Sequence, residues 1–314
     1  MVKGIVGNIK LAFNSASDFL FFKKYPNFST AYPRLTSTGD KVIIPDLKLV
    51  VDKARFPDVG RLAGELREID EKGVKLTSKD GEIIGNWNGV SFSIEDRCNI
   101  ITVKEIFIEE LYKFKLDKKV VVIDIGMNVG LASLYLASLD GVAHVYGYEP
   151  FEFTFEKAKK NLGMNPRMAG MITPVMEGIS GSSYQLDTTF NKKDHTSMGT
   201  LGVVEEHHAD SAFDENVSIR LVDVEDVISK VRAAHPGMEI LVKMDCEGSE
   251  YDIMDRLEGT GSIKAPVHYM IEWHVMKKEH DPQRIISALE KNGYFINQSK
   301  KSEKIGMIYA TRVS

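Results

Sequence analysis

The chain has 314 residues, a hydrophobic fraction of 43% and a formal net charge of −5. This length and composition indicate a globular protein with one main domain and a smaller attached region. The 40 basic residues form no arginine-rich tract, so a nucleic-acid partner is not expected and a small-molecule partner is favoured. The two cysteines, Cys98 and Cys246, lie outside CxxC and Cys/His spacings, which disfavours a disulfide framework or a structural zinc site.

Polar residues interrupt the apolar letters of the N-terminal segment MVKGIVGNIKLAFNSASDFLFF before a signal-peptide core or a membrane span can form. We therefore predict a cytoplasmic protein without stable membrane association. The FLFF run at 19–22 could touch a membrane surface, although a docked amphipathic helix is the favoured interpretation.

Residues 1–101 predict a small mixed α/β region. Turn residues at 79–81 and 88–89 separate β-like runs, and one helical stretch lies between them. Nothing in this region has catalytic spacing, so we interpret it as a cap or as a surface for homo-oligomerisation. The β-like runs are KVIIPDLKLVV, GVKLTSKDGEIIGNW and GVSFSIEDR, and the helical stretch is VGRLAGELREIDEKG.

The main domain is predicted to span residues 102–314. A capping-box pattern at Thr102 and Glu105 predicts the start of a helix that leads into it. Strand-like and helix-like runs then alternate, and the chain ends in a hairpin, which predicts a mostly parallel sheet finished by antiparallel strands. Residues 185–216 are polar and are predicted to form an irregular loop over the site. The predicted parallel strands are 120–126, 144–150, 171–177, 241–247 and 267–274.

The segment DIGMNVG stands where the first of these strands turns into its helix. Gly126 and Gly130 there let the backbone approach a ligand closely, and the N–H groups that open the next helix favour a polar or anionic group. Glu149 ends the following strand, where a carboxylate can accept two hydrogen bonds from a ribose diol. The same residue could instead cap the helix that follows.

The glycine spacing differs from the G-x-G-x-x-G of nicotinamide dinucleotide sites. Asp124, before the first glycine, would repel phosphates and attract an ammonium group. S-adenosylmethionine is a ligand of that kind, so the residues favour it as cofactor. A nicotinamide-dinucleotide-dependent oxidoreductase and a non-catalytic S-adenosylmethionine-binding module stay as alternatives.

At this point the sequence resembles class I S-adenosylmethionine-dependent methyltransferases, and more narrowly the FkbM family. The matching segments are VVVIDIGMNVG, YGYEPFEFTFEKAKKNL, SIRLVDVEDVI, LVKMDCEGSEYDIM and YMIEWH, and they occur in the family's order. The K-x-D-x-E-G-x-E pattern is the most specific of them. The resemblance implies a Rossmann-like fold with a seven-stranded sheet, and O-methyl transfer to a hydroxyl of a small molecule, sugar or other natural product.

The resemblance also implies how the cofactor would be held. The glycine turn would hold its methionine part, the acid after the second strand its ribose, and the pair after the third strand its adenine. The Asn/Asp-Pro-Pro-aromatic tetrapeptide of amino-methylating relatives is replaced by DCEG, which disfavours DNA or protein amines as acceptors. The implied cofactor residues are Asp124, Gly126, Asn128, Gly130, Glu149, Glu177 and Gly178.

The segment LVKMDCEGSEYDIM places charges at the end of a predicted buried strand. If the strand continues to Glu247, then Lys243, Asp245 and Glu247 alternate onto one side at the carboxyl end of the sheet, where ligands bind. The neighbouring strand ends in Glu272 and His274, so these side chains are expected to line one pocket. We predict that Asp245 and Glu247 position the acceptor and that His274 acts as the base.

Other interpretations of these charges are also open. Lys243 is read as one half of a buried ion pair with a strand-end carboxylate, and Glu250 as the first residue of a helix. The catalytic prediction contains no metal, but Asp245, Glu247 and Glu272 could together bind magnesium or calcium. A second stretch, interpreted as a solvated loop and not as a metal cluster, contains Glu205, Glu206, His207, His208 and Asp210.

Overall fold

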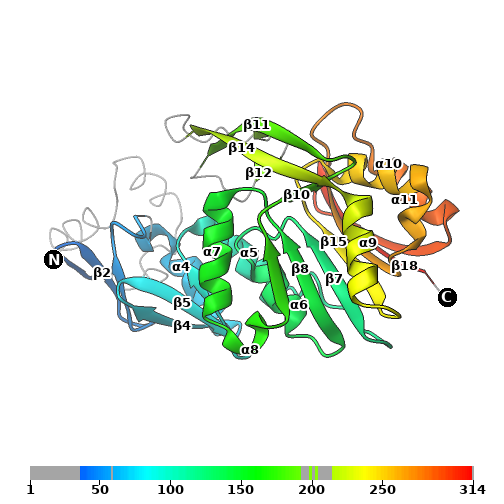
Figure 1. The fold of residues 1–314 in the computed structure, drawn as a ribbon. Coiled ribbons are helices and arrows are strands. Elements are labelled where there is room, and N and C mark those ends of the chain that lie inside the picture. The colour runs from blue at the N-terminus through cyan, green and yellow to red at the C-terminus, as the bar shows by residue number, and fades with distance from the viewer. Residues whose placement is uncertain (1–35, 58, 192–197, 200–201, 204–213, 313–314) are drawn as a thin grey trace. The chain divides into compact units, whose positions relative to one another are not determined.

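The computed structural model describes residues 36–57, 59–191, 198–199, 202–203 and 214–312 (Figure 1). The chain divides into two compact units, Met1–Leu111 and Tyr112–Ser314. The FLFF run and the stretch with the adjacent histidines both lie outside the described residues. Within those residues, no helix is both long enough and apolar enough to cross a membrane.

The N-terminal unit contains two antiparallel three-stranded sheets, ordered β1-β2-β3 and β4-β5-β6. Both hairpins of the second sheet turn through two residues with positive φ, Asp80-Gly81 and Asn88-Gly89, as a type I′ turn requires. The predicted strands, turns and helix are therefore confirmed. The elements are β1 (Thr36–Thr38), β2 (Lys41–Ile44), β3 (Leu49–Asp52), α4 (Val59–Glu71), β4 (Lys75–Lys79), β5 (Glu82–Trp87) and β6 (Val90–Ile94).

The end of this unit differs from the prediction. Helix α5 (Arg97–Val103) begins before the predicted capping box, because the Asp96 side chain accepts a hydrogen bond from Asn99 N–H and caps it. A short π-helix, η1 (Lys104–Ile108), continues it. The predicted helix start at Thr102 is wrong: its hydroxyl lies inside α5 and donates to a backbone carbonyl one turn earlier. Both helices lie within the N-terminal unit, Met1–Leu111, and the predicted domain boundary at 101 stays a prediction.

The second unit is built on a seven-stranded sheet in the order β17-β18-β16-β15-β7-β8-β9. All neighbours are parallel except β18, which is antiparallel to both of its partners. The predicted mostly parallel sheet with a C-terminal antiparallel hairpin is confirmed. Its strands are β7 (Val120–Ile125), β8 (Val142–Tyr148), β9 (Ile172–Val175), β15 (Glu239–Met244), β16 (His268–His274), β17 (Tyr294–Lys300) and β18 (Ile305–Arg312).

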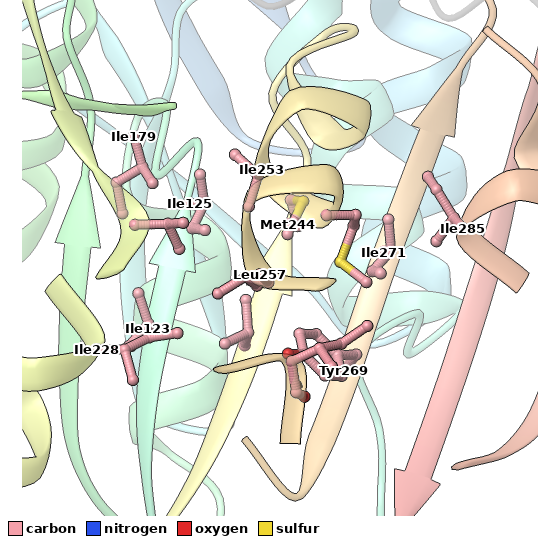
Figure 2. Close-up of a cluster of buried hydrophobic side chains, with 14 of the residues drawn as sticks. Ile123, Ile125, Ile179, Ile228, Met244, Ile253, Leu257, Tyr269, Ile271 and Ile285 are labelled. Atoms are coloured by element: carbon pink, nitrogen blue, oxygen red, sulfur yellow. Dashed lines mark hydrogen bonds between the residues drawn. The ribbon is translucent and has the colours of Figure 1, made fainter. Parts of the chain in front are cut away.

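Helices cover both faces of this sheet. Ile123 and Ile125 point to the face packed by α9 to α11, where Figure 2 shows them with Met244, Ile253 and Leu257 in one apolar cluster. Full burial of one such side chain contributes roughly 1.5–3 kcal/mol. Asp124 lies between these two residues in β7 and points to the opposite face of the sheet, toward α6. The helices are α6 (Leu131–Ala137), α7 (Glu152–Gly163), α8 (Pro166–Ala169), α9 (Val224–Ala234), α10 (Glu250–Thr260), η3 (Ser262–Lys264) and α11 (Pro282–Lys291).

A second sheet occupies part of the segment that was predicted to be a loop (Figure 1). The prediction for 185–216 is wrong at both ends, because β11 and β14 pair there as long antiparallel strands. Most side chains of β11 are exposed or half-buried, so its polar letters did not signal a strand. The elements are β10 (Gly178–Ser180), β11 (Tyr184–Asn191), β12 (Met198–Gly199), β13 (Gly202–Val203) and β14 (Asp214–Asp223).

Candidate active site

The glycine turn after β7 contains three residues with left-handed backbone: Gly126, Asn128 and Gly130, with φ of 78°, 51° and 82°. The N–H groups of Gly126 and of the next residue donate to Tyr148 O at the end of β8, at 3.1 and 2.9 Å. A Cβ on Gly126 would lie 1.8 Å from the carbonyl oxygen of Asp245, beyond the end of β15. The turn is thus held between the ends of its two neighbouring strands, at the edge where open α/β sheets bind ligands.

A buried ion pair between the two strands that lead to this turn and to the acidic loop that follows β15 stabilises the turn. Lys243 and Asp124 are register partners on neighbouring strands, and their side chains meet with Nζ 3.0 Å from Oδ1. Ser133 Oγ donates to the other oxygen of Asp124 at 2.6 Å, and Lys243 Nζ donates to Gly126 O at 2.7 Å. Burial opposes the charge on Lys243, but Asp124 and Asp245 outweigh it and raise the pKa of the ammonium group. The predicted pairing of Lys243 with a strand-end carboxylate is confirmed.

This pair changes the role expected for Asp124. The sequence suggested that its carboxylate attracts a positive group of the ligand, but its side chain is completely buried and already neutralises Lys243. Asp124 therefore acts on the turn through Lys243 in this structure, and its contact with a cofactor stays a prediction. Neither the register that brings these two together nor the contribution of Ser133 could be read from the sequence, because both depend on how the strand and helix pack.

Glu149 is nearly saturated with hydrogen bonds from the protein. Its Oε1 accepts from Phe151 N–H at 3.0 Å and from the Thr154 hydroxyl at 2.8 Å, and its Oε2 accepts from Asn128 N–H at 2.9 Å. Glu149 does not itself cap α7, because the N-cap is Phe151 and the carboxylate accepts from the N–H of that residue and from a hydroxyl in the first turn. Since each carboxylate oxygen can accept two hydrogen bonds, Oε2 can still accept one from a ligand. Burial raises the pKa of Glu149 to about 7, although these three donors act in the opposite direction.

Asn128 offers the turn's open hydrogen-bond acceptor. Its N–H is used by Glu149, but its Oδ1 is buried and accepts no hydrogen bond from the described residues. A buried acceptor left unsatisfied costs about 1–3 kcal/mol. A donor group on a ligand, such as an ammonium, would remove that cost. The turn therefore fits a ligand of the kind predicted from the sequence.

Gly178 lies beside Pro150, the residue that follows Glu149. A Cβ at Gly178 would meet Leu221 Cδ2 at 2.4 Å and Pro150 at 3.3 Å, so the glycine is required by packing between β10 and β14. Glu177 instead pairs with Arg220 of β14, with Oε1 3.2 Å from Nη1. A cavity of about 730 Å³ opens next to Pro150. Its lining includes Phe151, Phe153, Lys157, Met176, Phe190 and Val217.

The acidic loop begins where β15 ends, at Met244. The predicted strand alternation through Glu247 is wrong, because Glu247 has a left-handed backbone with φ of 53° and turns the chain. In the described part of the second unit, Glu247 and Asn128 are the two non-glycine residues with positive φ. Such backbone conformations cost about 1–3 kcal/mol and concentrate at functional sites.

The turn nevertheless brings the predicted catalytic residues together. Asp245, Glu247 and His274 each offer one ligand-type atom within 4.8 Å of the others. His274 Nε2 lies 3.7 Å from Glu247 Oε2, and His274 Nδ1 lies 3.1 Å from Glu250 Oε1. Glu250 is fully buried and also accepts two backbone N–H groups of the acidic loop. It is the first residue of α10, as predicted. Its contact with His274 was not predicted, although Glu250 is the last acid of the K-x-D-x-E-G-x-E pattern and the pattern could have indicated a role for it.

Burial and mutual proximity shift the pKa values of this group. Burial raises the pKa of Glu247 to about 8, although His274 acts in the opposite direction. For His274, burial favours the neutral ring, but Glu247 and Glu250 outweigh it and raise the pKa to about 10. Glu272 is set apart from the cluster, because Lys301 Nζ donates to its Oε1 at 2.8 Å. The group of ligand-type atoms that lie close together contains His274 and not Glu272.

The sheet order, the antiparallel final pair, and a glycine turn after the first strand that meets an acidic loop after the fourth together define a Rossmann-like class I methyltransferase. The chain belongs to the methyltransferase FkbM domain family, since the sequence model of that family matches residues 124–296, more than half of the chain.

The chain is also similar to individual proteins. The chain is 23% identical over 240 residues to the methyltransferase sdnD of Sordaria araneosa, covering 67% of this chain and 88% of that protein. It is similar to the structure of methyltransferase FkbM from Methylobacillus flagellatus, with 12% identity and a TM-score of 0.43. This match covers 81% of this chain and 60% of that protein. It is also similar to M. jannaschii TYW2 in complex with AdoMet, with 15% identity, a TM-score of 0.39, and 89% and 100% of the two chains covered.

Proposed function

We propose that this protein is an S-adenosylmethionine-dependent O-methyltransferase that acts on a hydroxyl of a small molecule, a sugar or another natural product. The observation that carries the proposal is the close approach of Gly126 to the carbonyl of Asp245, which holds the ligand-type glycine turn directly against the acidic loop. A donor on the turn and an acceptor on the loop would therefore meet at one edge of the sheet. The mild net charge of −5 suits a small acceptor better than a nucleic acid.

The cofactor proposal rests on what the turn and its neighbours still have to offer. The buried Oδ1 of Asn128 would accept a hydrogen bond from the ammonium group of the methionine part. Oε2 of Glu149 has room for one ribose hydroxyl, one fewer than the two expected from the sequence. The cavity beside Pro150 and Gly178 would take the adenine. When bound, S-adenosylmethionine would supply an electrophilic methyl group.

The acceptor side rests on Asp245, Glu247 and His274. Methyl transfer is an in-line displacement, so holding the acceptor oxygen in line contributes much of the rate. Neither Asp245 nor Glu247 accepts a hydrogen bond from the described residues, so both can accept one from a hydroxyl. Loss of the hydroxyl proton to a carboxylate with a raised pKa would help the oxygen attack carbon. Glu247, with a pKa of about 8, suits this role better than His274, which holds its proton to about 10.

Calorimetric titration of S-adenosylmethionine and S-adenosylhomocysteine into the full chain, with NADH as the control ligand, tests the cofactor. The Asn128→Gly variant keeps the left-handed backbone and the N–H bond to Glu149 but removes the open acceptor. We expect it to weaken binding roughly tenfold, because a hydrogen bond to a charged group contributes about 1.5–3 kcal/mol. Asn88→Gly, at the same backbone conformation in the N-terminal unit, is the matched control and should bind normally.

Two results would overturn the proposal at different levels. Binding of NADH without either sulfur ligand would refute the cofactor. Binding of S-adenosylmethionine with methyl transfer to amines and to no hydroxyl would refute the acceptor class. Once binding is established, hydroxylated small molecules are screened by the appearance of S-adenosylhomocysteine, with Glu247→Gln as the variant expected to lose turnover but keep cofactor affinity.

A further inference from the structure

The cluster at the ends of β15 and β16 has the composition of a metal site as well as that of a catalytic site. Asp245, Glu247 and His274 come from two different elements, and their ligand-type atoms lie within 4.8 Å of one another. The Asp245 side chain is 31% exposed, which leaves a path from solvent, whereas those of Glu247 and His274 are 14% and 6% exposed. Two carboxylates and one imidazole on a half-enclosed edge can surround a small cation.

His274 is oriented as metal-binding histidines usually are. Its Nδ1 contacts Glu250 Oε1 at 3.1 Å, so Glu250 holds the N–H at Nδ1, and release of the Nε2 proton on binding of a cation would leave the lone pair on Nε2. That Nε2 has no hydrogen-bond partner among the described residues and points at Glu247, 3.7 Å away. Glu250 is itself fixed by two backbone N–H groups. A buried carboxylate that orients a histidine toward other ligands is the usual arrangement around a bound metal.

The charges around the cluster are not balanced by the protein. Five carboxylates meet two lysine ammonium groups and the ring of His274 here, and these three groups are already engaged by Asp124, Glu272 and Glu250. Lys243 Nζ is also 3.8 Å from Asp245 Oδ2, so it partly neutralises this one oxygen of the cluster. Grouped carboxylates without matching cations are costly at low exposure. The carboxylates are Asp124, Asp245, Glu247, Glu250 and Glu272, and the ammonium groups are those of Lys243 and Lys301.

We propose that Asp245, Glu247 and His274 bind one divalent cation of the Mg²⁺ or Mn²⁺ class. Two carboxylate ligands favour such oxygen-preferring ions, and these ions keep several positions for water or for a substrate oxygen. The set differs from the one suggested by the sequence, because Lys301 holds Glu272 and His274 takes its place.

The catalytic consequence of this site rests on the proposed function, whereas binding of the cation does not. An acceptor hydroxyl that occupies an open position on the cation would lose its proton more readily, because the metal stabilises the alkoxide. The cation would then share with Glu247 the work of activating the hydroxyl. Glu250 would be a positioning residue that holds the His274 ring toward the ion.

Titration of Mn²⁺ into the full, chelator-treated chain tests the site without any cofactor or acceptor. The electron paramagnetic resonance signal of free Mn²⁺ reports how much ion is bound. We expect one bound Mn²⁺ per chain, displaced by Mg²⁺, and a loss of affinity of roughly tenfold or more in Asp245→Asn and in Glu247→Gln. Asp255→Asn and Glu258→Gln, an exposed and a half-buried acid of α10, are the matched controls and should bind as the unmodified chain does.

The proposal is overturned if Mn²⁺ is not bound, or if it is bound equally well in both cluster variants, which would place it elsewhere. Circular dichroism checks that each variant is folded, and two variants at different positions protect the test against failure of one. Calorimetry with S-adenosylmethionine, run in parallel on the same metal-free chain, separates the two ideas. Cofactor binding without Mn²⁺ binding would refute only the cation site, and the reverse result would refute only the proposed function.

Discussion

Two neighbouring parts of the carboxyl edge of the sheet, called here the first edge and the second edge, treat their acids in opposite ways. At the ends of β7 and β8, Asp124 is paired with Lys243 and Ser133, and Glu149 accepts three hydrogen bonds. At the ends of β15 and β16, Asp245 and Glu247 accept no hydrogen bond from the described residues and lie close to each other and to His274.

The difference separates two uses of charge. The acids of the first edge are paired or hydrogen-bonded by the protein, apart from one acceptor position on Glu149 Oε2, and they fix the shape of the turn and the approach to the next helix. The acids of the second edge keep their acceptor capacity for something that is not part of the chain. Substitutions at the first edge should therefore reduce the stability of the fold, whereas substitutions at the second should reduce chemistry and leave stability intact or improved.

The largest effect is expected for Lys243→Met. Removing the ammonium group leaves the fully buried Asp124 unpaired, and breaking a buried ion pair by removing one partner costs about 3–5 kcal/mol. Urea unfolding of the full chain would measure this loss. The double variant Lys243→Met with Asp124→Asn should recover part of it, since no charge is then left buried alone. A loss below about 1 kcal/mol in the single variant would contradict the description of the first edge.

Gly126→Ala comes next. The new Cβ would collide with the carbonyl of Asp245 in a backbone conformation that disfavours a side chain, so we expect a loss of about 2–4 kcal/mol in urea unfolding. Gly163→Ala is the matched control. Gly163 is the last residue of α7, its φ is not positive and its Cβ would meet nothing, so alanine there should stabilise by up to about 1 kcal/mol. Equal effects at both positions would mean that the turn does not press on the acidic loop.

The smallest effect, and one of opposite sign, is expected for Glu247→Gln. Burial raises the pKa of Glu247 from 4.5 to about 8, so the folded chain favours its protonated form. The stability that this group contributes is fully present below about pH 4.5 and is lost as pH rises through about 8. Glutamine does not ionise, so the variant does not lose this stability as the pH rises. In chelator at pH 9 the variant should be about 1 kcal/mol more stable than the unmodified chain, and near equal to it below pH 4.5.

Unfolding measured at both pH values, with Glu258→Gln as control at a half-buried acid of α10, checks this sign. A destabilised Glu247→Gln at pH 9 would show that the second edge is as satisfied as the first, and the contrast between the edges would be lost.

The fold was readable from the sequence because its signals are local. A fully apolar run such as 120–123, a glycine turn after that strand and helical periodicity between the strands predict alternating parallel strands, and the structure has them along the chain in that order. The failures occurred where a local signal had a competitor. The helix is capped by Asp96 and not by Thr102, and the mostly polar, exposed side chains of β11 gave no strand signal.

The site was readable in membership but not in role. The sequence located Asp245, Glu247 and His274 in one place, but by an alternation that stops at Met244; the left-handed backbone of Glu247 brings them together instead. The role of Asp124 depends on its register against Lys243, and that of Glu272 on a lysine in a distant hairpin. Contacts of this kind are set by packing between elements, and a single sequence does not encode them in a pattern of its own.

Lys243 has one more consequence, for the order in which ligands bind. Its ammonium group holds Gly126 O, and the N–H of Asp245 donates to Ile125 O at 3.0 Å, so the turn and the acidic loop share their hydrogen bonds. Neither can open without disturbing the other. A ligand that orders the turn should therefore lower the entropic cost of ordering the loop, which predicts positive cooperativity between the two ligands and tighter binding of the acceptor once the donor is in place.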